Sequence, residues 1–103
     1  MKELKEMYNL MLEKLRGEHN TWVESNQKIN ALSDSLRKLG YKNGDTSSNP
    51  AINLLKDAFD KEVRKNGELT TEMYAHKDLI RDFELNAKRY ELELKGTYEI
   101  FGY

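Results

Sequence analysis

The residues most able to do chemistry are the two histidines and the carboxylates near them. In a helical pattern with a seven-residue period, His76 and Glu18 fall in neighbouring layers, with His19 and Glu72 close by. Imidazole and carboxylate groups together could ligate a metal ion. The Glu-x-x-His spacing of carboxylate-bridged di-iron bundles is missing, however. We therefore interpret His76 as a hydrogen-bonded histidine in a partly hydrated helix interface, and we expect neither a metal nor a cofactor.

Other routes to catalysis lack their usual residues. The chain contains no cysteine, which excludes thiolate nucleophiles, disulfides and thiolate metal ligands. Its serines and threonines do not lie in a nucleophile-elbow or Ser-x-x-Lys context, and no glycine-rich phosphate loop is present. We expect a non-enzymatic protein with no small-molecule substrate.

Length and charge restrict the class of protein. The chain has 103 residues, which suits one domain, and its 17 basic and 18 acidic side chains nearly balance. Such balance argues against nucleic-acid binding, unless oligomerisation assembles a basic face. No apolar run reaches the ~18 residues that span a bilayer, and the amino terminus lacks the apolar core of a signal peptide. We expect a soluble cytoplasmic protein that does not bind membranes.

Opposite charges recur four residues apart along the second half of the chain. This spacing predicts ion pairs on solvated helix faces, each worth a few tenths of a kcal/mol. The predicted pairs are Asp57 with Lys61, Asp60 with Arg64, Glu84 with Lys88, and Glu91 with Lys95.

Two long heptad patterns indicate an all-α fold. In the first, all five a positions from Tyr8 to Leu36 are apolar, and the second begins at Ile52. We predict a single helical-hairpin domain over residues 1–103. Its first helix spans about 2–39, a bend 40–49, its second helix about 50–95, where Gly96 ends it, and an extended tail 96–103.

The stretch between the two patterns contains the signals that end and begin helices. Gly40 suits the left-handed position after a helix, with Tyr41 able to pack on Leu36. Asn43-Gly44-Asp45 is typical of a turn. Asn49 then offers a side-chain cap, and Pro50 suits the first helical position. These signals favour a bend over a flexible linker.

A bend here predicts a long antiparallel two-helix coiled-coil hairpin, completed by dimerisation. With residue 39 opposite residue 52, most layers between the helices are apolar, and Ser25 and Asn66 share one layer. We predict that these two form a hydrogen-bonded, register-setting polar layer. Gly17 and Gly67 are the weak points of the helices. A compact bundle of three or four shorter helices is therefore the alternative fold.

Apolar residues outside the predicted helix interface concentrate at the open end of the hairpin. The tail, Thr97 to Tyr103, adds aromatic and β-branched residues that either fold back onto the hairpin or dock on another chain. The predicted partner or dimer interface comprises Met7, Leu10, Leu12, Leu79, Leu85, Leu92, Tyr98, Ile100, Phe101 and Tyr103.

A protein–protein interaction module is the function class that these features favour. Small adaptors, inhibitors and assembly factors, including those of phages and mobile elements, have this size and style. Two helices with a central bend, and the Tyr74-x-x-x-Asp78 spacing, are similar in outline to the helical-hairpin substrates of type VII secretion. That family's Trp-x-Gly turn is absent. The outline implies one alternative, a secreted hairpin working with a partner, and nucleic-acid binding is another.

Overall fold

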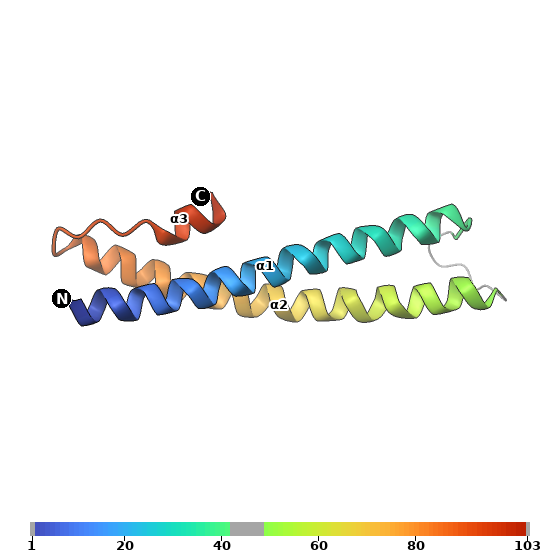
Figure 1. The fold of residues 1–103 in the computed structure, drawn as a ribbon, viewed down its shortest axis with the longest axis horizontal. Coiled ribbons are helices and arrows are strands. Elements are labelled where there is room, and N and C mark those ends of the chain that lie inside the picture. The colour runs from blue at the N-terminus through green and yellow to red at the C-terminus, as the bar shows by residue number, and fades with distance from the viewer. Residues whose placement is uncertain (1, 42–48, 103) are drawn as a thin grey trace. The chain divides into compact units, whose positions relative to one another are not determined.

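The structure is an all-α helical hairpin (Figure 1), seen in a computed structural model that describes residues 2–41 and 49–102. Two long helices, α1 (Lys2–Lys38) and α2 (Pro50–Lys88), pack against each other, and a short helix, α3 (Gly96–Phe101), follows. The predicted hairpin is confirmed. Both long helices continue through Gly17 and Gly67, so the alternative of three or four shorter helices is not adopted.

The helix ends that flank the bend form as predicted. Gly40 has a φ of 81°, and its N–H donates to the Arg37 carbonyl at 3.0 Å. The Tyr41 N–H donates to the Leu36 carbonyl, also at 3.0 Å, which completes a Schellman motif. At the start of α2, the Asn49 Oδ1 accepts from the Ala51 N–H at 2.9 Å. The predicted turn at 43–45 lies outside the described residues.

The hairpin divides into two compact units, and the unit nearer the bend holds the polar layer. This bend unit comprises residues 22–68, and Leu36 and Ile52 are buried within it. The Asn66 Nδ2 donates to the Ser25 Oγ at 3.2 Å and to the Asn26 Oδ1 at 2.7 Å. The two predicted partners therefore meet, and Ser25 is buried. Their role in setting the register stays a prediction.

The second unit, the open-end unit, comprises residues 1–21 and 69–103. Leu15 and Met73 are completely buried at its centre. Nearer the open end, the rings of Tyr8 and Phe83 stack with their centroids 5.7 Å apart. Tyr8, Leu12, Ile80 and Ala87 are also buried. The core of this unit is therefore built from residues near both ends of the sequence.

The prediction that α2 extends to about residue 95 is wrong, because α2 ends at Lys88. The Leu92 N–H donates to the Ala87 carbonyl and the Glu91 N–H to the Lys88 carbonyl, both at 3.1 Å. These bonds form a second Schellman motif, with Glu91 at a φ of 62° in the position that glycine usually occupies. Because no glycine stands at this position, the usual sequence signal for a Schellman helix end is missing.

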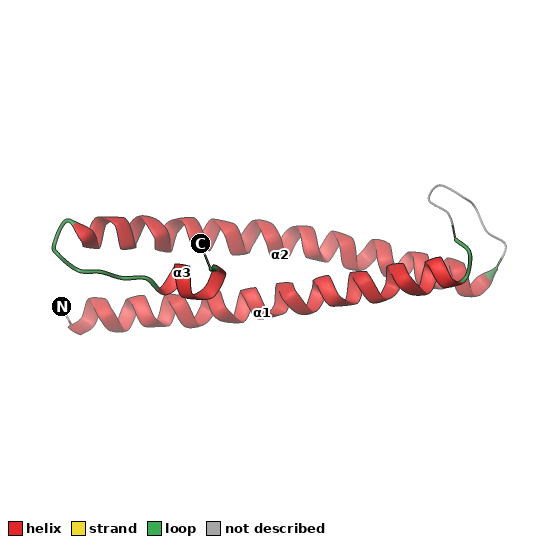
Figure 2. Cartoon of the chain, turned by 90° about the horizontal axis from the view of Figure 1, so that it is seen from above, coloured by secondary structure: helices red, strands yellow, loops and turns green. Residues whose placement is uncertain are grey.

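The prediction of an extended tail is also wrong, because Gly96–Phe101 forms α3. The Gly102 N–H donates to the Tyr98 carbonyl, and Gly102 ends the helix with a φ of 79°. Gly96 and Thr97 are buried. Tertiary burial thus overrides the strand preference of the tail's aromatic and β-branched residues. Figure 2 shows the connector, residues 89–95, that leads from α2 to α3.

Replacing Glu91 tests the unusual end of α2. A side chain in the left-handed region costs about 1 kcal/mol, and glycine avoids this cost. We expect Glu91→Gly to have a free energy of unfolding about 1 kcal/mol higher than that of Glu91→Ala, because only alanine pays the cost of the left-handed conformation. Both variants lose the same carboxylate, so the comparison isolates the backbone effect. Denaturant titration measures the difference. Equal stability of the two variants would contradict the left-handed conformation at this residue.

Candidate functional site

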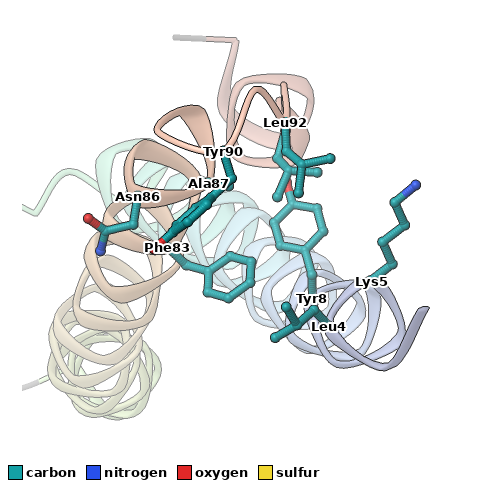
Figure 3. A pocket seen from close by; sticks show the side chains of 9 residues that line it. Leu4, Lys5, Tyr8, Phe83, Asn86, Ala87, Tyr90 and Leu92 are labelled. Atoms are coloured by element: carbon teal, nitrogen blue, oxygen red, sulfur yellow. The ribbon is translucent and has the colours of Figure 1, made fainter. Parts of the chain in front are cut away.

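An apolar hollow of about 270 Å³ opens at the end of the open-end unit (Figure 3). Three segments supply its walls: the first turns of α1, the last turns of α2 and the connector. The lining residues are Leu4, Lys5, Tyr8, Phe83, Asn86, Ala87, Tyr90, Leu92 and Leu94. This hollow is the candidate functional site.

The early end of α2 creates the hollow. Because the chain leaves the helix at Lys88, the connector turns back and brings Leu92 beside the Tyr8 ring (Figure 3). Phe83 and Tyr8 face each other below it, while the amine of Lys5 and the amide of Asn86 point away. The walls are therefore apolar although two polar residues border them. Such a hollow suits a bulky apolar group.

A buried carboxylate anchors the connector and α3 next to the hollow. The Tyr8 hydroxyl donates to the Glu84 Oε2 at 2.5 Å, and the Thr97 N–H donates to the same oxygen at 3.1 Å. The Thr97 hydroxyl donates to the Glu84 Oε1. Glu84 is 5% exposed and Thr97 completely buried. Three donors thus satisfy a carboxylate whose burial would otherwise be costly.

Gly96 completes this anchor. Its N–H donates to the Tyr8 hydroxyl oxygen at 2.9 Å. A Cβ on Gly96 would overlap the Leu12 side chain and lie 2.7 Å from that oxygen. With glycine here, the backbone approaches α1 this closely without displacing either side chain.

The environment of Tyr8 keeps its phenol neutral. Burial, reinforced by the hydrogen bond to Glu84, raises the pKa of Tyr8 above its ordinary value. Tyr8 can therefore donate to Glu84 throughout the neutral range. The network binds parts of the chain to each other, and we assign it a structural role.

His76 is hydrogen-bonded, as predicted, and lies in the same unit. Its Nδ1 lies 2.7 Å from both carboxylate oxygens of Glu18. His19 contacts a different group, the Phe101 ring, at 5.1 Å between centroids, and Glu72 is exposed. Over residues 2–41 and 49–102, no three His, Cys, Asp or Glu side chains are grouped to hold a metal ion.

Most of the predicted interface residues lie on the surface of the open-end unit. Met7, Leu10, Leu79, Leu85 and Tyr98 are exposed, with Leu79 at 68%. Leu92, Ile100 and Phe101 are partly exposed, and Tyr103 lies outside the described residues.

Leu12 is the exception, because it is only 5% exposed and its side chain lies against Gly96. Its assignment to a partner interface is therefore wrong: the chain's own C-terminal segment covers it.

The hollow was not predicted from the sequence. A second helix that continues to about residue 95 would keep Phe83, Ala87, Tyr90 and Leu94 in one helix, with no returning connector to form a cavity. The alternation of charged and apolar residues from Glu91 to Lys95 was the available signal, because a period of two is not helical.

Comparisons with models of known protein families, with curated proteins and with solved structures found no match. In the part of the chain that the structure describes, none of the helices combines the length and the apolar character needed to cross a membrane.

Two glycine substitutions with opposite expected effects test the anchor. Gly96→Ala should lower the free energy of unfolding by about 1–3 kcal/mol, because Leu12 and Tyr8 must move aside. Gly17→Ala should raise it by about 1 kcal/mol, because nothing lies within 4 Å of the new methyl group and alanine favours helix. Thermal and denaturant unfolding measure both. A neutral Gly96→Ala would contradict the close approach.

The raised pKa of Tyr8 predicts a loss of stability in alkali. Above about pH 10 the phenol ionises in the unfolded chain but stays protonated in the folded one. The stabilisation that the neutral phenol provides is therefore complete below this pH and is lost as the pH rises above it. The free energy of unfolding should then fall by about 1.4 kcal/mol per pH unit as the pH rises toward the folded-state pKa. Tyr8→Phe, although less stable at about pH 9, should lack this component. Parallel slopes for both proteins would refute the assignment.

Proposed function

We propose that this chain is a non-enzymatic protein–protein interaction module that binds a protein partner, or a second copy, at its open end. The proposed contact, the open-end surface, is the hollow together with the exposed large apolar residues of the open-end unit. These residues are Leu4, Met7, Leu10, Leu79, Leu85, Tyr90 and Tyr98.

The single observation that carries this proposal is the apolar hollow in a unit that also exposes seven large apolar side chains. Within the described residues, the bend unit exposes only three large apolar side chains: Leu39, Leu54 and Val63. Concentrated exposed apolar surface commonly marks an interaction site. Burying one leucine side chain contributes about 1.5–3 kcal/mol, so a partner that covers several would gain substantially.

The shape of the hollow supports binding by a protruding side chain. Protein interfaces are dominated by a few anchors that fill well-packed apolar pockets, and the walls here include three aromatic rings: Tyr8, Phe83 and Tyr90. A small adaptor, inhibitor or assembly factor, including one of phage or mobile-element origin, would act in this way. We propose a cytoplasmic site of action, which suits a chain without disulfides.

Site-specific photo-crosslinking tests the proposed surface, with a matched control. A photoreactive phenylalanine replaces Tyr90, which is 77% exposed on the hollow, or Leu54, which is 71% exposed in the bend unit. In host cells, position 90 should crosslink to a defined protein or a second copy in at least about tenfold higher yield than position 54. Adding Leu4→Glu should abolish the crosslink from position 90, because it places a charge in the apolar wall.

Equal yields at positions 90 and 54 would contradict the proposal. Deleting the tail is a poorer test, because Gly96 and Thr97 are buried parts of the fold and their loss would perturb the unit itself.

A further inference from the structure

A second hollow, of about 260 Å³, lies next to the first and shares Leu94 with it. Three cations border this second hollow, Arg81 and Lys88 of α2 and Lys95 of the connector, together with the carboxylates of Glu84 and Glu93. Leu85 and Tyr98, both more than half exposed, supply apolar surface beside these cations. Leu94 therefore separates an apolar hollow from a charged one in which three cations outnumber two carboxylates.

The buried anchor leaves these cations available. The spacing of Glu84 and Lys88 predicts an ion pair, but the Glu84 carboxylate instead accepts hydrogen bonds from Tyr8 and Thr97. Among the described residues, neither Arg81 nor Lys88 forms an ion pair. The third cation, the Lys95 Nζ, lies 3.9 Å from the Glu93 Oε1 in an exposed pair, which contributes little energy.

We propose that the partner binds as an acidic amphipathic peptide segment, an inference that rests on the proposed function. A bulky apolar side chain of this segment fills the first hollow. One or two carboxylates, placed next to it along the segment, face Arg81 and Lys88 across the second hollow. An arginine at such a rim can bind a carboxylate through two parallel hydrogen bonds.

Other occupants fit this surface less well. A nucleic-acid backbone would match the cations but would set phosphates against the apolar walls of the first hollow. A second copy that docked by a two-fold axis centred on the second hollow would place Arg81 and Lys88 opposite like charges. An acidic amphipathic segment complements both hollows at once.

Selection from a random peptide display library tests this inference with the intact chain as bait. Peptides retained by the wild type should be enriched in Asp and Glu next to bulky apolar residues. A synthetic peptide of the selected sequence should bind Arg81→Glu/Lys88→Glu at least about tenfold more weakly, because each contact becomes repulsive. The matched charge reversal Lys61→Glu/Arg64→Glu, in the bend unit, should leave its affinity unchanged.

The outcomes separate this inference from the proposed function. Selected peptides that are not enriched in Asp and Glu would overturn the inference but not the proposed interaction surface. The same holds for peptides that bind Arg81→Glu/Lys88→Glu as tightly as the wild type but no longer bind Leu4→Glu. If the wild type retains no more peptide than the Leu4→Glu variant does, both the inference and the proposed function are overturned. A pure chain that forms a dimer unaffected by Arg81→Glu/Lys88→Glu would identify a second copy as the occupant and would also overturn the inference.

Discussion

The buried carboxylate of Glu84 holds the two ends of the chain together. It accepts hydrogen bonds from Tyr8 near the start of α1 and from Thr97 at the start of α3. A buried charge is stable only where donors surround it, so the site fixes the positions of both partners. Gly96 adds to this constraint because any larger residue would force Leu12 and Tyr8 to shift. The short α3, too small to be stable alone, is thereby part of the fold.

This constraint also shapes the surface that we propose to be functional. The connector must return from Lys88 to the Tyr8 hydroxyl, and its path places Leu92 and Leu94 over the end of the hairpin. The apolar hollow lies beneath this path. Because the Glu84 carboxylate is used inside the unit, Lys88 has no ion-pair partner in the described chain. One buried interaction thus underlies both the apolar and the cationic parts of the open-end surface.

Local signals in the sequence were sufficient to predict the hairpin. The bend follows from Gly40, Asn49 and Pro50, whose conformational preferences act over a few residues, and the Ser25–Asn66 contact follows from the heptad register. The end of α2 was not predictable in this way, because Glu91 adopts a conformation that favours glycine. The docking of α3 depends on contacts between residues 13 to 88 positions apart in the sequence. No local pattern encodes such contacts, so the docking of α3 could not be predicted from the sequence.

Hydrogen exchange of the Thr97 amide tests whether the Glu84 carboxylate holds α3 against the long helices. Thr97 is completely buried, and its N–H donates to the Glu84 Oε2. We expect exchange at least about a hundredfold slower than in an unstructured peptide. Glu84→Ala should lose this protection while the amides of the bend unit stay protected. Exchange of Thr97 at the unstructured rate in the wild-type chain would contradict the account.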